Sequence, residues 1–446
     1  MDRRTALALF VLAFVPYCWF YGGWGANQEA NFALTRSIVE ARTLHVDDFT
    51  VHEGDIAAGA GGHIYINRPP GLSLLGVVPY KIQRAVERRA QIQFRDYWRT
   101  NKMMVTVAVC GLCGALIAPI LYLYGRRLGA HRWNAAAAAI AVAFGTIVLP
   151  YSTMYFAHVP SALFLLVALV LLRERPLLAG LAAGVAGACF FVCAIAAVLL
   201  IPLAWHYAPR KAAWFVAGGV PIAIGLAVYQ WICFGSPFTA PLQRSAAYTE
   251  KGLLLGVFGR VDASRLWGLT FSEYRGLFCC SPILLLAFVG AALMMRRARA
   301  ELAAIAAITI VFFAVMISFN GWHGGAAFGP RYLVPVIPLM AIAMMFAGDR
   351  GRWVWIAAGA VSIAINVAAT AVDPMPEPEV MRPLTGYILP SLARGRVALV
   401  QDSGNLGELL FGKGNALSIV PAALWIVAGS WWILAAAARD PSLRSG

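Results

Sequence analysis

The sequence predicts an all-α polytopic membrane protein, and three observations support this class. Of its 446 residues, 60% are hydrophobic and only 13% are charged, and the mean hydropathy is +0.71. This composition lies outside the range of soluble globular domains. Apolar runs of about 17 to 25 residues, the length that crosses a hydrocarbon core as a helix, recur from one end of the chain to the other.

The sequence divides into eleven apolar segments, the first of which follows Met1-Asp2-Arg3-Arg4. No convincing small-residue cleavage site comes after this first segment, and more apolar segments follow, so we expect a retained span rather than a removed signal. The predicted segments are residues 5–22, 104–124, 133–150, 155–172, 176–206, 212–233, 276–294, 301–319, 331–347, 353–372 and 416–438.

The stretch 176–206 is expected to cross the membrane twice. At about 31 residues it is short for two complete spans. A single crossing, however, would place the later Arg-rich loops on the opposite side from the earlier ones, against the positive-inside bias. We therefore expect a tight hairpin of half-length helices. The result is a bundle of about 12 segments, within a range of about 11–13, with both termini in the cytoplasm.

Charged residues sort clearly under this topology. Short basic loops, such as those with Arg126 and Arg127 or with Arg296 and Arg297, face the cytoplasm, and most carboxylates lie outside. Attraction of the cytoplasmic cations to anionic lipid accounts for much of the net charge of +15, so no nucleic-acid partner is predicted. The eight cysteines are scattered in or beside the apolar segments and predict neither a metal centre nor a structural disulfide.

Three outer loops, residues 23–103, 234–275 and 373–415, are too long to be simple connections, so function is expected there, within a single domain of residues 1–446. In the first loop, NQEANFALTRSIVEART predicts an amphipathic helix in which Arg36 pairs with Glu40. The later segment LSLLGVVPYKIQRAVERR predicts a helix that lies in the membrane interface. An irregular, Gly-rich stretch separates the two helices. The third loop opens with DPMPEPE and is interpreted as a lid.

The predicted membrane segments contain no carboxylate except Glu301, which is the first residue of the segment 301–319 and lies at its cytoplasmic end. Ion-coupled transporters usually keep ionisable residues near the bilayer midplane, so this class is the weakest candidate. The acids gather instead at the outer mouth, where they suit catalysis on a substrate at the membrane surface. Glu29, just after the first segment, and Asp55, in the acidic irregular stretch, are the candidate catalytic residues. Glu29 has the alternative role of complementing a helix dipole, and Asp55 that of a solvated loop charge.

Basic residues at the outer ends of apolar segments are the candidate phosphate ligands. Arg331 ends the Gly-rich stretch NGWHGGAAFGPR, in which glycine lets backbone approach a ligand closely. Arg68, in the turn NRPPG, and Arg275, in FSEYRGLF, are further candidates, and each has the alternative role of reaching toward lipid headgroups. His158, flanked by aromatics, and His323 are secondary candidates that would otherwise serve in packing.

In their order along the chain, these features resemble the GT-C superfamily of membrane glycosyltransferases, in particular the bacterial branch similar to protein O-mannosyltransferase and lipid A aminoarabinose transferase (glycosyltransferase family 39-like). The resemblance covers most of the chain and is carried by five segments in order. They are NQEANFALTRSIVEART, HIYINRPPGLSLLGVVPY, YSTMYFAH, FGSPF with WGLTFSEYRGLFCCSPILL, and GGAAFGPRYLVPVIPLMA.

The resemblance implies inverting transfer of a sugar from a polyprenyl-phosphate donor to a lipid, glycan or protein acceptor on the extracytoplasmic face, within a bacterial inner membrane. A loop carboxylate would serve as base and basic residues would hold the phosphate. Glu29 matches the second acid of the pair that opens the family's first loop. Gln28 replaces the first acid and, with Asn27, joins the substrate-binding candidates. Asn67-Arg68 replaces an Asp-Lys pair, which leaves activity and the identity of the base open. Dependence on a divalent metal ion is also open.

Two other functions share the same outer site. A non-catalytic polyprenyl-phosphate carrier binder or flippase would need the lipid pocket and Arg331 but neither Glu29 nor Asp55. A polymerase or ligase of surface polysaccharide would use the same lipid donor to transfer a preassembled glycan. No Gly-rich phosphate loop for a soluble nucleotide sugar is present in the sequence.

Overall fold

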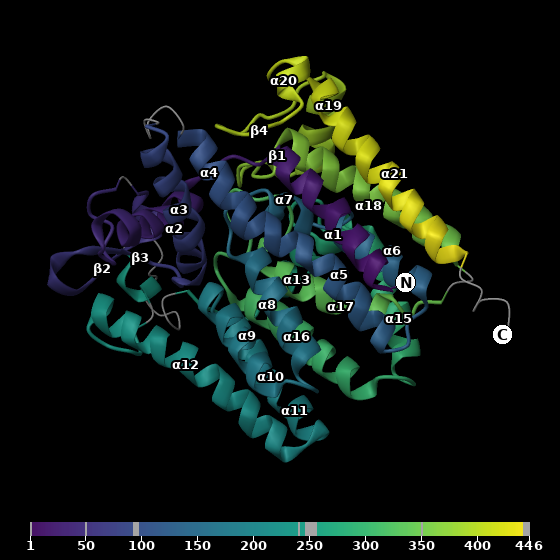
Figure 1. Cartoon of the computed structure of the whole chain (residues 1–446), viewed down its shortest axis with the longest axis horizontal. Helices are drawn as coiled ribbons and strands as arrows, with labels where there is room; N and C mark the ends of the chain where they lie inside the picture. The colour runs from purple at the N-terminus through teal and green to yellow at the C-terminus, as the bar shows by residue number, and fades with distance from the viewer. Residues whose placement is uncertain are drawn as a thin grey trace.

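The computed structural model describes residues 2–49, 51–91, 98–239, 241–245, 257–348 and 351–439, and it confirms the all-α membrane class. Apolar helices form one body, and a smaller outer layer built mainly from residues 20–106 covers one end of it (Figure 1). The helices of the body are α1 (Asp2–Trp19), η5 (Val107–Gly111), α5 (Leu112–Arg127), α6 (Arg132–Phe144), α7 (Val148–Ser152), α8 (His158–Leu171), α9 (Pro176–Cys189), α10 (Val192–Leu199), α11 (Ile201–Tyr207), α12 (Pro209–Phe234), α14 (Leu277–Cys280), η7 (Pro282–Leu285), α15 (Leu286–Met294), α16 (Arg299–Ser318), η8 (Arg331–Val336), α17 (Ile337–Met344), α18 (Arg352–Val372), η10 (Ala416–Ile419) and α21 (Val420–Ala438).

The three predicted outer loops, together with the adjoining ends of the neighbouring apolar segments, contain short helices and two small sheets. Their elements are β1 (Phe20–Tyr21), α2 (Ala26–Arg36), η1 (Ser37–Ala41), η2 (Glu53–Asp55), β2 (Ile56–Ala58), η3 (Ala60–Gly62), β3 (Ile64–Ile66), α3 (Gly71–Arg89), α4 (Trp98–Thr106), η6 (Pro241–Arg244), α13 (Ala263–Thr270), η9 (Pro383–Ile388), α19 (Leu389–Ala393), β4 (Gly404–Asn405) and α20 (Glu408–Phe411).

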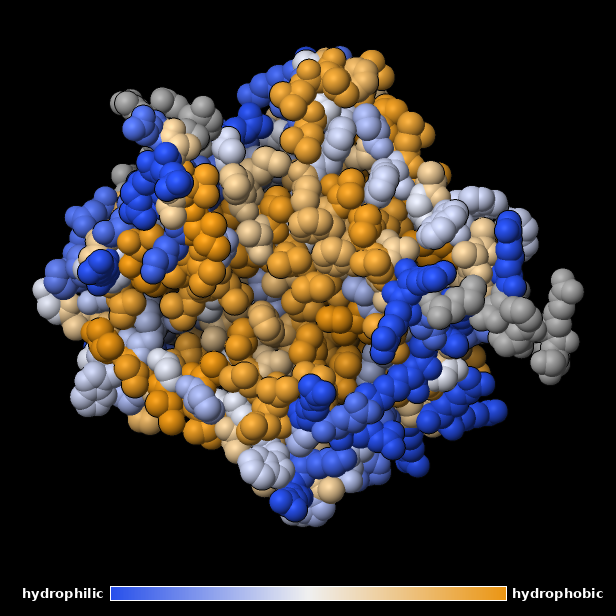
Figure 2. All heavy atoms as spheres, in the orientation of Figure 1, coloured by the Kyte–Doolittle hydropathy of each residue, from blue (hydrophilic) through white to orange (hydrophobic). Residues whose placement is uncertain are grey.

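Five of the described helical segments are long and apolar enough to cross a membrane: Arg99–Arg127, Pro209–Phe234, Arg299–Ser318, Arg352–Val372 and Ala416–Ala438. The other apolar helices of the body are shorter, so the predicted total of about 12 crossings stays a prediction. Only 17% of the most apolar window in Ala416–Ala438 is buried inside the protein. Figure 2 shows the resulting apolar band, with hydrophilic residues gathered at opposite margins of the molecule. Such a surface suits a hydrocarbon solvent.

The stretch 176–206 folds back on itself, as predicted. Its helix α9 ends at Cys189, the next residue, Phe190, has an extended backbone, and α10 and α11 then return. At the far end, the Lys211 ammonium donates to the Arg173 carbonyl at 2.6 Å, which places the entry and exit of the stretch side by side. The helix α9 also packs closely on α12, where glycines remove the side chains that would keep the two backbones apart.

Two of the outer helices differ in their exposure. Six consecutive residues of α2, Ala30 to Thr35, are buried, and the predicted pair of Arg36 and Glu40 forms with a 3.2 Å N–O distance. In contrast, α3 exposes the apolar residues Val78, Ile82 and Val86 on one face, as the predicted interfacial helix requires. Gly71, in the predicted turn NRPPG, is the first residue of α3. A Cβ at this position would lie 2.4 Å from the Ala188 carbonyl oxygen, so only glycine fits there.

The stretch between these helices, predicted to be irregular, contains a short β-hairpin. Strands β2 and β3 pair antiparallel with Ile56 opposite Ile66, and η3 forms the connection at the tip. The third outer loop is likewise more regular than expected. Its strand β4 pairs with β1, directly after α1, so the loop is fastened to the start of the first outer loop.

Candidate functional site

The base of the β2–β3 hairpin brings together two residues that the sequence separates. Asp55 is the last residue of η2, just before β2, and Arg68 is the second residue after β3. Their side chains form an ion pair, and the Asp55 side chain is only 5% exposed. Asn67 fixes this arrangement, because its backbone N–H donates to the Asp55 carbonyl at 3.1 Å and its buried amide donates to the Gly54 carbonyl at 2.8 Å.

Asn27, in the first turn of α2, completes the surroundings of Arg68. With its amide oriented so that the oxygen faces the guanidinium, that oxygen accepts from Arg68 Nη1 at 2.8 Å and from Arg68 Nε at 2.9 Å. The guanidinium therefore lies between a neutral oxygen and the Asp55 carboxylate. About a fifth of the Arg68 side chain stays exposed, which leaves it accessible to an anion.

Arg331, predicted at the outer end of an apolar segment, begins η8 and is buried. Its guanidinium lies 5.0 Å from the ring centroid of Phe156 and 5.2 Å from that of Tyr332. The backbone of Gly324, with φ of +79°, passes so close that a Cβ there would lie 3.0 Å from Arg331 Nε. This Nε is buried and has no hydrogen-bond partner in the described part of the chain. Arg331 thus retains unused capacity to donate a hydrogen bond.

His158, the first residue of α8, lies among the same aromatic rings. Its ring stacks on Phe156 at 5.8 Å between centroids and meets Tyr332 edge-on at 5.5 Å. The buried His158 Nδ1 also has no hydrogen-bond partner among the described residues. The charges of Arg331 and Arg68 lie within electrostatic reach of His158, and the Asp55 carboxylate lies within reach of Arg331. We call Asn27, Asp55, Arg68, His158 and Arg331 the Asp55 cluster.

Glu29 lies outside the Asp55 cluster. It is two positions after Asn27 on α2, so the two side chains point in different directions. Its carboxylate pairs with the buried ammonium of Lys102, on α4, which also lies 4.9 Å from the ring centroid of Trp24. The structure therefore separates the two candidate bases: Asp55 lies with the predicted phosphate ligands, and Glu29 has a different cation.

The remaining predicted residues hold backbone in place. Gln28 accepts from the Gly25 N–H at 3.2 Å at the start of α2, and its amide contacts Met375 of the third outer loop. Arg275 is fully buried and donates to the carbonyls of His323 and Gly325, each at 2.9 Å.

His323 is itself part of this backbone arrangement, because its Nδ1 accepts from the Gly325 N–H at 3.1 Å. Partial burial, with the charges of Arg275 and Arg331, lowers the pKa of His323. His323 therefore has less tendency than an ordinary histidine to carry the charge that would attract a phosphate.

Two groups were not singled out from the sequence. Lys102 lies two residues before the predicted apolar segment 104–124. A lysine at the edge of an apolar segment could have indicated a buried ion pair. The aromatic rings of Phe156 and Tyr332 adjoin His158 and Arg331 in sequence, but their contact across the fold was not foreseeable. In the described residues, the set of three side chains with metal-ligand spacing is His45, Asp47 and His63, none of which belongs to the Asp55 cluster.

Two surface hollows lie beside the outer layer. One, of about 380 Å³, is an apolar groove between α3 and α4, lined by residues that include Ile82, Val86 and Met104. The other, of about 470 Å³, is lined by Gly259 to Arg265 and by Asn320. Neither is lined by a member of the Asp55 cluster.

No family model matches the sequence, and no curated protein matches it. Among solved structures, the chain is similar to the oligosaccharyltransferase of Archaeoglobus fulgidus in its apo form, at 12% identity and a TM-score of 0.45, over 97% of this chain and 56% of that one. It is also similar to the oligosaccharyltransferase AglB of the same organism in complex with an inhibitory peptide and a dolichol-phosphate, at 12% identity and a TM-score of 0.46, over 97% and 55% of the two chains. This chain spans little more than half of each archaeal protein, and at this level of similarity the neighbours do not identify its activity.

Proposed function

We propose that this chain is a membrane glycosyltransferase that moves a sugar from a polyprenyl-phosphate donor to a hydroxyl group of a glycan, lipid or protein acceptor on the extracytoplasmic face, with inversion. The observation that carries the proposal is the Asp55 cluster. One carboxylate, two guanidiniums and one imidazole, drawn from residues 55, 68, 158 and 331, gather at one end of a body of apolar helices. An acid beside two cations is the combination that a base and a phosphate leaving group require.

Arg331 and Arg68 serve as the ligands of the donor phosphate in this mechanism. The Arg331 Nε has no hydrogen-bond partner among the described residues. Arg68 is partly exposed and exchanges some of its contact with Asn27 and Asp55 for the phosphate oxygens. Guanidinium groups suit this role because their donors match the spacing of phosphate oxygens. His158 adds an N–H donor beside them.

Asp55 serves as the base. Its carboxylate takes the proton of the acceptor hydroxyl while the acceptor oxygen bonds to the anomeric carbon. The bond from that carbon to the phosphate oxygen breaks, and its electron pair stays on the phosphate, where the two arginines stabilise the added charge. A single displacement of this kind inverts the anomeric configuration. Glu29 has a structural role, as the partner of buried Lys102.

The test is sugar transfer by the purified protein in lipid nanodiscs, with a panel of polyprenyl-phosphate sugars and mixed acceptors. Asp55→Asn should lower turnover by about 10²- to 10⁴-fold, the usual loss for a general base, while donor binding persists. The matched control is Asp48→Asn, which changes an exposed acid in the same loop and should leave turnover unchanged. Arg331→Ala should weaken donor binding.

Glu29→Gln separates the two candidate bases. If Asp55 is the base, this variant should lose thermal stability because Lys102 stays buried without its carboxylate, but each folded molecule should keep its turnover. Loss of turnover in Glu29→Gln with activity retained in Asp55→Asn would reverse the assignment. Donor binding by the parent protein without transfer to any acceptor would favour the carrier-binding function.

A further inference from the structure

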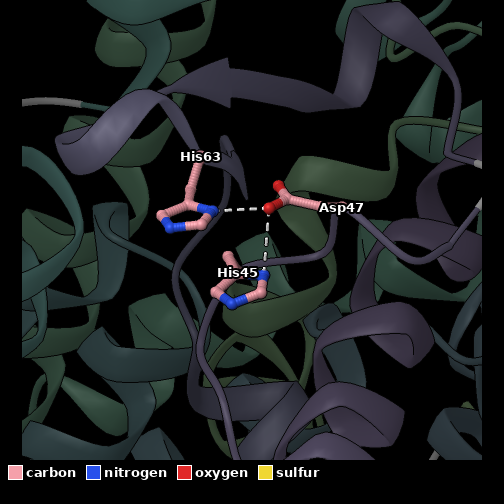
Figure 3. A group of neighbouring side chains, drawn as sticks. All are labelled: His45, Asp47 and His63. Carbon is pink, nitrogen blue, oxygen red and sulfur yellow. Dashed lines mark hydrogen bonds and ion pairs between the residues drawn. The ribbon is translucent and has the colours of Figure 1, made fainter.

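Three side chains in the first outer loop converge on one point (Figure 3). His45 and Asp47 follow η1, and His63 immediately precedes β3. The Asp47 carboxylate oxygen Oδ2 lies 2.6 Å from His63 Nδ1 and 3.2 Å from His45 Nδ1. The two imidazole rings stack with their centroids 4.3 Å apart. One ligand atom from each of the three residues lies within 4.8 Å of the others.

The surrounding backbone holds this group in place. Asp47 Oδ1 accepts from the Ile64 N–H at 2.7 Å, which turns the other carboxylate oxygen toward the histidines. The Val46 N–H donates to the Ile64 carbonyl at 2.8 Å, so the His45–Asp47 segment lies along β3. Second-sphere hydrogen bonds of this kind orient the ligands of metal sites.

His45 Nδ1 provides an independent sign of an absent ligand. This nitrogen is buried and, despite its 3.2 Å contact with Asp47, makes no hydrogen bond to any described residue. Buried polar atoms are nearly always satisfied in native proteins, by protein, water or ion. The His63 side chain is 46% exposed and the Asp47 side chain 32%, so an ion can enter from solvent.

The ligand set favours zinc. Two imidazole nitrogens and one carboxylate oxygen are ligands that Zn²⁺ accepts, and three protein ligands leave the fourth tetrahedral position for water. Two ligand atoms, each about 2.0–2.1 Å from a tetrahedral ion, lie roughly 3.3 Å apart. The 3.2 Å separation of His45 and Asp47 already has this value, and that of His63 and Asp47 needs to widen by less than one ångström, roughly 0.7 Å on the same geometry.

We propose that His45, Asp47 and His63 bind one zinc ion, which fastens the segment after η1 to the start of β3. The ion would not take part in sugar transfer. The three residues of β3, which rise roughly 10 Å in all, separate His63 from the Asn67–Arg68 end of the hairpin. The site therefore stands independently of the proposed function.

Zinc binding to the tag-free protein in nanodiscs, after removal of metal with a chelator, tests this site. Titration should give one bound Zn²⁺ per chain, and Co²⁺ in its place should produce the visible absorption of a four-coordinate complex. His63→Ala and Asp47→Asn should each weaken binding by at least about tenfold, as expected when a ligand is lost. His206→Ala is the control, because it removes an exposed histidine at the other end of the molecule.

Zinc should also raise the melting temperature of the parent protein and of His206→Ala, because a ligand of the folded state stabilises it. If His63→Ala does not fold, His45→Gln with Asp47→Asn supplies the comparison. Absence of stoichiometric zinc binding by the parent would overturn the proposal. Equal affinity in the parent and in correctly folded Asp47→Asn would overturn it too, since the ion would then lie elsewhere.

Discussion

Two arginines that look equivalent in the sequence have opposite environments in the structure. Both Arg275 and Arg331 precede apolar segments, and both were predicted to bind phosphate. The Arg275 guanidinium, however, already donates to the backbone carbonyls of Tyr274, His323 and Gly325. Arg331 instead lies among aromatic rings, and its Nε has no hydrogen-bond partner within the described part of the chain. Whether a guanidinium has donors to spare depends on contacts across the fold, which residue type and local spacing do not encode.

Arg275→Met should destabilise the protein strongly. The substitution leaves buried carbonyls of the glycine-rich segment without donors, at a cost of roughly 2–5 kcal/mol in the free energy of unfolding. Thermal unfolding in nanodiscs measures the effect, with the exposed Arg394→Met as control. A melting temperature equal to that of the parent would show that Arg275 does not hold this segment.

The candidate acids illustrate how far single residues could be predicted. The sequence placed both candidate acids, Glu29 and Asp55, in the first outer loop, and in the structure each forms an ion pair there. It did not distinguish the two, because Glu29 is close to Asn27 in sequence yet points elsewhere on α2. The partners Lys102 and Arg68 come from other elements, so only the fold separates the two acids.

At the scale of elements, small residues set the packing of α9 on α12. A Cβ at Gly218 would lie 1.9 Å from the Leu177 carbonyl oxygen, and one at Gly180 would lie 1.8 Å from the Phe215 carbonyl oxygen. The two helices therefore touch backbone to backbone. Without a hydrophobic driving force inside a bilayer, such close contact is a main source of helix association.

Gly218→Ala should destabilise the protein by about 1–3 kcal/mol, because the added methyl group forces the backbones apart. Gly225→Ala is a matched control on the same helix, since nothing lies within 4 Å of its added Cβ. This control should be neutral or stabilise the protein by up to about 1 kcal/mol, as glycine is a poor helix former. Equal melting temperatures for the two variants would contradict the close packing.

Long apolar helices were predictable from the sequence, and the short strands of the outer loops were not. Helices such as α12 and α18 coincide with predicted segments because a sustained apolar run leaves few alternatives. The β2–β3 hairpin was missed because each strand has three residues, too few to show an alternating pattern. Its glycine-rich tip was interpreted as irregular chain for the same reason.

The whole molecule presents an apolar exterior along its long helices. In α12 and α21, large side chains such as Trp214, Trp231 and Trp431 are exposed, which would be unfavourable in water and is expected in lipid. The composition predicted the membrane class because a chain with 60% hydrophobic residues has too few polar side chains to cover its whole surface. The number of membrane crossings could not be predicted in the same way. It depends on the apolar helices of 10–17 residues, and length alone does not show whether such a helix crosses the membrane.

The orientation of the molecule leads to a labelling prediction. Ala60, in the hairpin tip, and Arg297, after α15, are both exposed. In right-side-out vesicles, an impermeant maleimide should label Ala60→Cys, and Arg297→Cys should react only after permeabilisation, each measured above the parent protein. The opposite pattern would invert the topology and place the Asp55 cluster in the cytoplasm.

The β2–β3 hairpin has a consequence for how such a protein diversifies. Asp55 and Arg68 lie at the base of the hairpin, where hydrogen bonds of Asn67 hold the backbone in place. Gly62, at the tip, faces open space. Insertions at the tip lengthen a loop at little cost in free energy and leave the spacing of acid and cation unchanged. The surface at the tip can therefore drift over evolutionary time while Asp55 and Arg68 at the base stay in register.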